Sequence, residues 1–260
     1  MLSLIGYIGR TIRTFLQHVS GFFWLFGQTL SWIFLKPYRL RLKPIFQQME
    51  FIGFNSIPIV CFVSLFFGLT LAMLTSYQLE KVGSELLVGG LVGVAFTREL
   101  GPLLTSLVIS ARVGAAITAE LGTMKVGEEI DALDTMALEP VRFLIAPRLI
   151  AIVLMLPLLV ILSNIMGILG GYIIGFTNLH MNTGFYFRMT FDAMVLKDIY
   201  TGLFKSVFFA FIIGMVGSYQ GFIVRGGAEG VGRATTTSVV TSIELVIIVD
   251  AFLNAVFYFI

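Results

Sequence analysis

The 260-residue chain has little charge: Asp, Glu, Lys and Arg make up 12% of it, with a net charge of only +2. In ordinary soluble domains the charged share is about a quarter. Hydrophobic residues make up 57% of the chain, and its mean hydropathy is +0.96. A soluble fold of this size cannot bury so much apolar surface. The composition therefore excludes a soluble enzyme, a disordered protein or a nucleic-acid-binding protein, and indicates an integral membrane protein.

The sequence also lacks the common catalytic and metal-binding patterns. Cys61 is its one cysteine, so neither an intrachain disulfide nor a cysteine metal cluster can form, and His18 and His180 lie far apart in the sequence. There is no G-x-x-x-x-G-K-[ST] phosphate loop, no H-E-x-x-H and no G-x-S-x-G. We therefore expect no catalytic residue, no metal and no cofactor in this chain.

Long apolar segments are abundant instead. A helix that crosses a bilayer needs about 20 mostly apolar residues. Such segments predict an all-α integral membrane protein with five spans in a single membrane domain over residues 1–260. The spans are predicted at residues 51–79, 86–111, 149–176, 203–224 and 234–260.

Residues 15–35 are apolar enough to span, but Trp24, Trp32, Gln17 and Gln28 suit a helix that lies at the membrane interface. The positive-inside rule favours the interfacial helix over a sixth span. With residues 1–45 as an interfacial segment and 51–260 as the bundle, the N-terminus is cytoplasmic and the C-terminus lies outside. The cytoplasmic basic residues are then Arg10, Arg13, Lys36, Arg39, Arg41, Lys43, Lys125, Arg142, Arg148, Arg225 and Arg233. The outer basic residues are Lys81, Arg188, Lys197 and Lys205, and 177–202 is the largest outer segment.

Arg98 and Glu99 fall near the middle of the second span. A charge at the bilayer centre costs at least about 2.5–3.5 kcal/mol, so such residues face a cavity, a partner or one another. Arg112, 14 residues beyond Arg98, returns to nearly the same helix face and would extend a basic stripe.

Two interpretations of these charges remain open at this stage. The functional one is a polar site for an anionic headgroup or an ion. The structural one is pairing with Glu244 or Asp250 of the fifth span. Lys205 and Asp250 both lie toward the outer half and could also pair.

The segment between the second and third spans is rich in charge. Residues 128–136 contain good helix formers, with Ile130, Leu133 and Met136 apolar at near-helical spacing, and Pro140 should stop the helix. This short amphipathic helix is either a solvated loop or a docking surface for a partner.

Small residues recur every four positions in several spans, which lets helices approach closely in lipid. Either internal packing or a subunit interface explains this spacing. The series are Gly167, Gly171 and Gly175, then Gly89 and Gly93, then Gly217 and Gly221.

A set of motifs, ordered along the chain from about residue 40 to its end, resembles the MlaE/YrbE permease family, the membrane subunits of MCE-type lipid ABC transporters. The motifs are TRELGP at 97–102, SARVG at 110–114, AELGTM at 119–124, EEIDAL at 128–133, APR at 146–148 and GVGRATT at 230–236.

The resemblance implies an N-terminal interfacial elbow helix, five transmembrane helices, and a short cytoplasmic coupling helix between spans 2 and 3. It implies a homodimer with a lipid cavity opening toward the periplasm, a separate ABC ATPase that binds the ATP, a periplasmic MCE-domain hexamer and, in some systems, a small STAS-domain protein. The implied function is to move phospholipid between the bacterial inner membrane and the MCE ring, which maintains outer-membrane lipid asymmetry.

The resemblance also assigns roles to residues. The expected lipid-binding residues are Leu71, Leu74, Tyr77, Arg98 and Glu99. The expected ATPase-coupling residues are Glu128, Glu129, Asp131, Leu133 and Met136.

A competing interpretation is a stand-alone secondary transporter or ion channel that uses Arg98, Glu99, Glu244 and Asp250 as a relay. Inverted repeats would favour it, and the sequence shows none. An intramembrane lipid enzyme is disfavoured by the missing nucleophile and metal patterns.

Overall fold

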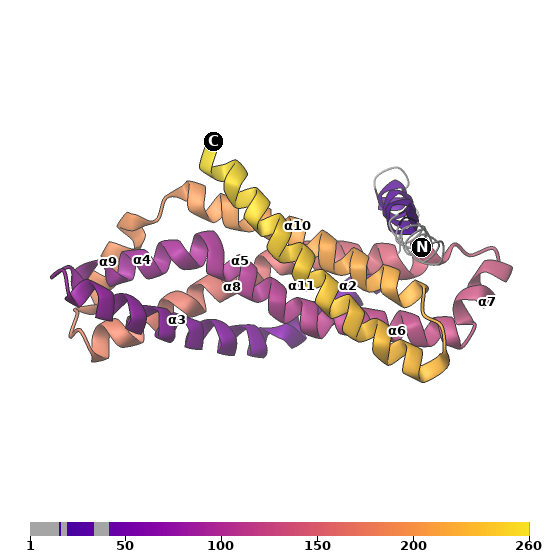
Figure 1. Cartoon of the computed structure of the whole chain (residues 1–260), viewed down its shortest axis with the longest axis horizontal. Helices are drawn as coiled ribbons and strands as arrows, with labels where there is room; N and C mark the ends of the chain where they lie inside the picture. The colour runs from indigo at the N-terminus through magenta and orange to yellow at the C-terminus, as the bar shows by residue number, and fades with distance from the viewer. Residues whose placement is uncertain (1–15, 17–19, 34–41, 260) are drawn as a thin grey trace, which may run out of the picture.

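The computed structural model describes residues 16, 20–33 and 42–259, and these residues contain helices and turns but no strand. Five of its helical segments are long and apolar enough to cross a membrane. Figure 1 shows them along an elongated bundle, with the last one running obliquely across it. The predicted all-α, five-span architecture is confirmed. The five segments are Leu42–Glu80, Glu85–Val126, Val141–Thr177, Leu196–Phe222 and Gly227–Tyr258.

The first segment consists of α2 (Leu42–Ile52), a 3₁₀ turn (Phe54–Ser56) and α3 (Ile57–Glu80). It packs along the helix of the third span, α8 (Ala146–Thr177). The contact is close because a Cβ on Gly68 would lie 2.1 Å from the carbonyl oxygen of Gly167. One of the predicted small-residue faces therefore serves packing inside the chain.

The second segment is longer than the predicted span at 86–111, because the helix continues through its polar end to Val126. Two π-helical stretches interrupt it, and both carry family motifs. Its parts are a 3₁₀ turn (Glu85–Leu87), α4 (Val88–Ala95), η4 (Phe96–Leu100), α5 (Gly101–Ile109), η5 (Ser110–Gly114) and α6 (Ala115–Val126).

A short helix, α7, follows as predicted and ends before Pro140. A third π-helical stretch, η6, leads into α8, and the last two spans follow after a short helix, α9. The bounds are α7 (Glu129–Thr135), η6 (Val141–Ile145), α9 (Thr183–Ala193), α10 (Leu196–Phe222) and α11 (Gly227–Phe259).

Residues 177–202 are not a free outer loop, because α9 within them packs against α4. Tyr186 of α9 is buried against Gly89, where a Cβ would lie 3.1 Å from its ring. Burial raises the pKa of Tyr186 to about 12, and its phenol donates to the carbonyl of Ile168 at 3.2 Å. The small residues of the second span therefore hold α9 in place.

Residues 20–33 form a helix that lies across the long axis of the bundle (Figure 1). One side of it is buried in the main apolar core through Leu25 and Trp32, whereas Phe23 and Trp24 are exposed. This placement agrees with an interfacial helix. Arg10, Arg13, Lys36, Arg39 and Arg41, which the charge argument used, lie outside the described residues.

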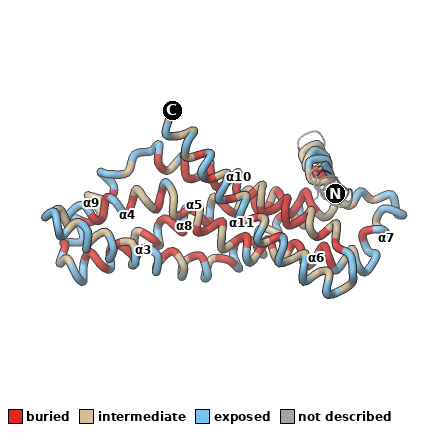
Figure 2. The backbone as a smooth tube through the Cα atoms, viewed as in Figure 1, coloured by how far each residue is buried: buried red, intermediate tan, exposed pale blue. Residues whose placement is uncertain are grey.

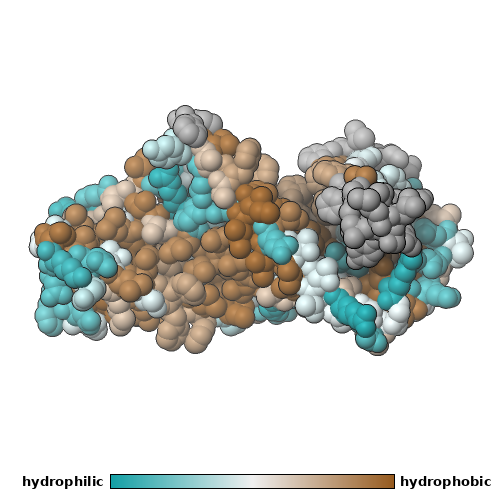
Figure 3. Space-filling view, viewed as in Figure 1, coloured by the Kyte–Doolittle hydropathy of each residue, from teal (hydrophilic) through white to brown (hydrophobic). Residues whose placement is uncertain are grey.

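Buried residues form a continuous interior along the bundle (Figure 2). The surface divides into zones: in Figure 3 hydrophobic residues cover the middle of the molecule, and hydrophilic residues gather toward its two ends. The outer faces of α3 and α11 carry large exposed apolar side chains, among them Phe62 and Phe66 on the first and Ile248 and Phe252 on the second. These faces suit contact with lipid or another membrane chain.

Candidate functional site

A charged network joins η4, α10 and α11 inside the bundle. The ammonium of Lys205 is fully buried and lies 2.5 Å from a Glu99 carboxylate oxygen and 3.0 Å from one of Asp250. It also donates to the side-chain oxygen of Asn254 at 2.6 Å, while the Asn254 amide donates to Glu99 at 2.8 Å. A buried charge is tolerated only when it is paired and hydrogen-bonded, and here one cation serves two carboxylates.

The backbone of η4 supplies one more partner, for a reason that lies in the sequence. Pro102 has no N–H, so the carbonyl of Arg98 four residues earlier has no helical donor from that position. Lys205 donates to this carbonyl at 3.3 Å. The π-helical stretch is therefore part of the lysine site as well as a distortion of the helix.

α10 reaches this site because Gly202 has no side chain. A Cβ on Gly202 would lie 2.2 Å from the carbonyl oxygen of Thr97. Lys205 follows Gly202 by one helical turn, so the same close approach brings its ammonium to Glu99.

Arg98 takes a different direction from Glu99. Its Nε lies 3.9 Å from a carboxylate oxygen of Asp198 in the first turn of α10, and its side chain is 46% exposed. Neither candidate acid of the fifth span pairs with Arg98 in the described residues: Asp250 binds Lys205, and Glu244 is exposed on α11. Structural pairing therefore accounts for Glu99, whereas the Arg98 guanidinium keeps exposed donors.

The predicted basic stripe of Arg98 and Arg112 is wrong. Arg112 donates to the hydroxyl of Ser56 and contacts the Phe51 ring at the junction of α2 and α3, whereas Arg98 meets α10. Arg98 lies in η4 and Arg112 in η5, and these π-helical stretches widen the helical turn, so the spacing of an ideal α-helix does not apply.

Three of the predicted lipid-binding residues, Leu71, Leu74 and Tyr77, lie on α3. Leu74 and Tyr77 are exposed by 63% and 60%. Leu71 is half-buried against the smaller apolar cluster, which also receives Leu100. No hydrogen bond, ion pair or ring contact in the described part of the chain joins these residues to Arg98 or Glu99.

The five predicted coupling residues lie on or beside α7 at one end of the bundle. Glu128, with φ of 58°, starts the helix, and Glu128, Glu129 and Asp131 are all exposed. Leu133 is half-buried, and Met136 is 67% exposed. They form one acidic surface with an apolar edge.

Ile130 and one of the predicted coupling residues, Asp131, fasten α7 to the bundle. Ile130 is buried, and Lys125 at the end of α6 pairs with Asp131 at 2.7 Å. Nearby, the buried Arg148 at the start of α8 pairs with Glu120 of α6 at 2.8 Å. These contacts hold the ends of the second and third spans together around the short helix.

The predicted pairing of Lys205 with Asp250 is confirmed. Two partners went unrecognised in the sequence, Asn254 and Asp198. Asn254 carried a signal, because it lies four residues after Asp250 and so on the same helix face. Asp198 carried none, since its approach to Arg98 depends on how α10 packs.

The fold and the buried network thus define a class: a multi-pass helical membrane protein built around intramembrane charges. Residues 45–256 match the family model described as Permease MlaE. The chain is 37% identical to a probable ABC transporter permease protein of Rickettsia typhi, over 95% of each chain. It is 34% identical to a probable ABC transporter permease protein of Synechocystis, over 94% of this chain and 92% of the relative.

It is also 31% identical to the intermembrane phospholipid transport system permease protein MlaE of Haemophilus influenzae, over 99% of this chain and 98% of that protein. The chain belongs to the MlaE permease family and is an ABC transporter permease.

Proposed function

We propose that this chain is the membrane subunit of an ATP-driven transporter that moves phospholipid between the inner membrane and a periplasmic ring of MCE-domain subunits. Two copies would enclose the lipid cavity, and a separate cytoplasmic ATPase would bind and hydrolyse ATP. The transporter would serve outer-membrane lipid asymmetry. The observation that carries the proposal is the half-exposed Arg98 guanidinium, held within a membrane span beside a network that occupies Glu99.

A guanidinium suits a phosphate ester because its planar fork can donate two parallel hydrogen bonds to phosphate oxygens. The Asp198 carboxylate is 3.9 Å away, a separation that leaves the Arg98 donors free for another acceptor. Lys205 and Asn254 bind Glu99, so this acid does not compete for the arginine.

The acyl chains need an apolar wall, and the exposed face of α3 supplies one. Leu74 and Tyr77 lie on this face, and Leu71 lies beside it. The exposed apolar face of α11 offers a second wall. A second copy of the chain would close the space between such faces, which supports the dimer.

The α7 end is proposed as the cytoplasmic end. Positive residues accumulate on the cytoplasmic side of membrane proteins, and this end carries more of them than the α9 end does. The α7 end has Lys125, Arg142, Arg148, Arg225 and Arg233, whereas the α9 end has Lys81, Arg188 and Lys197. The exposed acids of α7 would then face the ATPase.

Purification from the native membrane in mild detergent, with mass spectrometry of all bound species, tests the proposal. We expect an ATPase, an MCE-domain protein and diacyl phospholipid. A chain that arrives alone and lipid-free, in detergent that preserves other complexes, would favour a stand-alone transporter that uses its intramembrane acids.

An Arg98→Ala variant tests the lipid site in the same preparation. We expect less bound phospholipid with an unchanged melting temperature, and partial recovery with Arg98→Lys. Arg188→Ala is the matched control, because Arg188 is exposed on α9 outside the spans. Unchanged lipid with lower stability would assign Arg98 a purely structural role.

A further inference from the structure

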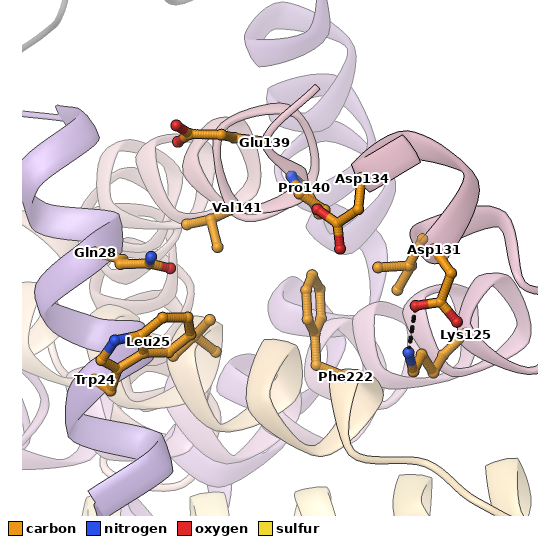
Figure 4. Close-up of a pocket in the computed structure, with 11 residues that line it drawn as sticks. Trp24, Leu25, Gln28, Lys125, Asp131, Asp134, Glu139, Pro140, Val141 and Phe222 are labelled. Carbon is orange, nitrogen blue, oxygen red and sulfur yellow. Dashed lines mark hydrogen bonds and ion pairs between the residues drawn. The ribbon is translucent and has the colours of Figure 1, made fainter. Parts of the chain in front are cut away.

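A pocket of about 290 Å³ opens beside α7, between the helix of residues 20–33 and the ends of α6 and α10. Figure 4 shows Trp24 and Leu25 on one side and α7 on the other, with Phe222 between them. The walls are therefore largely apolar and aromatic. Neither the sequence nor the family motifs indicated this pocket, because its two sides are far apart along the chain.

Three carboxylates stand around these walls: Asp131, Asp134 and Glu139. Lys125 also lines the pocket, but its ammonium pairs with Asp131 at 2.7 Å. The side chains of Asp134 and Glu139 form no hydrogen bond or ion pair with the described residues, and both are exposed. Three acids and one lysine give the pocket a formal charge of −2. The remaining lining is mostly apolar.

We propose that this pocket receives one arginine or lysine side chain of the cytoplasmic ATPase. The inference rests on the proposed function, and it identifies which surface recognises the ATPase. The aliphatic stem of such a side chain would pack on Leu25 and Phe222, and its charged head would meet Asp134, while Glu139 adds a second negative charge to the lining. Trp24 adds an aromatic face, which attracts a cation.

A phospholipid fits this pocket poorly. Its volume of about 290 Å³ lies at the lower limit of small-ligand sites, which run from about 300 to 1,000 Å³, so a diacyl lipid does not fit. Even a lipid with an amine headgroup brings a phosphate, and the two free carboxylates would repel it. A protein side chain brings the cation without the phosphate.

The pocket also continues the surface proposed for ATPase docking, because α7 forms one of its walls. The opposite wall is tied to the bundle: the Arg142 guanidinium lies 5.6 Å from the Trp32 ring, and Phe22 packs edge-on against Tyr219 of α10 at 5.8 Å. A side chain seated here would touch α7, the interfacial helix and the end of α10 together. ATPase motion would thus reach α10, the helix that also carries Lys205.

The test is a titration of the purified ATPase subunit against the purified permease, with the variant Asp134→Asn/Glu139→Gln. We expect the double variant to weaken ATPase binding by about tenfold or more, because it removes both unpaired negative charges of the pocket. Raising the salt concentration should weaken binding to the native protein more than to the variant. Glu50→Gln is the matched control, an exposed acid on α2 outside the pocket.

The possible outcomes separate the two proposals. Equal affinity of the native protein and the double variant would overturn the pocket proposal and leave the transporter function standing. Failure of the ATPase to bind even the native permease would count against the transporter function itself. Unchanged ATPase affinity with loss of a bound amine-headgroup lipid, seen by mass spectrometry, would also overturn the proposal and assign the pocket to lipid.

A charge-reversal experiment complements this test: Asp134→Lys should lower the affinity for the ATPase further than Asp134→Asn. Reversing the sign of the matching basic residue on the ATPase should then restore binding. Recovery of this kind would identify the inserted side chain, and a screen of the basic residues on the docking face that restores nothing would contradict the proposal.

Discussion

The two charged regions of this molecule are organised in opposite ways. In the bundle, the Lys205 ammonium is fully buried and is satisfied by Glu99, Asp250 and Asn254 from two other helical elements. Around α7 the acids are exposed, and of those lining the pocket only Asp131 has a cationic partner in the described residues.

The difference follows from the surroundings of each region. A charge within the membrane must find its partners in the same chain or pay a large desolvation cost. Charges at the end of the bundle remain hydrated, so they can stay unpaired until another protein covers them. The first region is therefore complete as it stands, whereas the second has the properties of a surface that another protein completes.

The largest expected effect on stability comes from removing Lys205 from the buried charged network. Lys205→Met leaves the buried Asp250 carboxylate and the partly exposed Glu99 carboxylate without their cation, and breaking a buried pair in this way costs about 3–5 kcal/mol. We expect a strongly lowered melting temperature in detergent, measured by thermal unfolding.

The triple variant Lys205→Met/Glu99→Gln/Asp250→Asn carries no buried charge and should recover much of that stability. If Lys205→Met is as stable as the native protein, the network does not hold the helices together.

A smaller effect is expected when the approach of α10 is blocked. Gly202→Val brings a Cβ into collision with the Thr97 carbonyl, since the ideal Cβ would lie 2.2 Å from that oxygen. Overpacking of this kind costs about 1–3 kcal/mol. Gly232→Ala in α11 is the control, because a Cβ there meets nothing within 4 Å; equal melting temperatures for the two variants would contradict the close contact.

Pro102→Ala should produce a smaller change. The new N–H can bond to the Arg98 carbonyl and compete with Lys205, which donates to it at 3.3 Å. One hydrogen bond is worth about 0.5–1.5 kcal/mol, so the melting temperature should shift by a few degrees at most. Amide exchange of residues 98–102 should show whether the π-helical stretch becomes an ordinary α-helix.

The smallest effect on stability is expected in the exposed region. Glu129→Lys changes an exposed residue of α7, and Leu133→Asp changes a half-buried residue outside both apolar clusters of the bundle, so the bundle should melt at the native temperature. Lipid transport by the reconstituted complex should nevertheless fall, because ATP hydrolysis is no longer coupled to the permease. Normal transport with either variant would remove α7 from the coupling role.

The sequence predicted the features that depend on local composition. The length of the apolar runs located all five spans. Pro140 predicted the end of the short helix after the second span, and α7 does end before it. The helix of the second span continues past the predicted apolar run, because the polar residues beyond Ala111 are helical too: Arg112 and Glu120 find partners on neighbouring elements. Partners of that kind cannot be seen in a hydropathy pattern.

The candidate site was predictable only in part. Arg98 and Glu99 stood out because they are charges in an apolar span, and the pairing of Lys205 with Asp250 followed from their similar depth. The directions of Arg98 and Arg112 did not follow, because π-helical stretches change the angle between successive residues. The pocket beside α7 could not be predicted either, since Trp24 and Phe222 meet only through tertiary packing.

Hydrogen exchange of the purified permease with and without its ATPase tests most directly the contrast between the buried Lys205 network and the exposed acids around α7. We predict that the ATPase protects the amides of residues 20–33 and 125–141 and leaves those around Glu99, Lys205 and Asp250 unchanged. Protection at α9 instead, or no change at either end, would contradict the account.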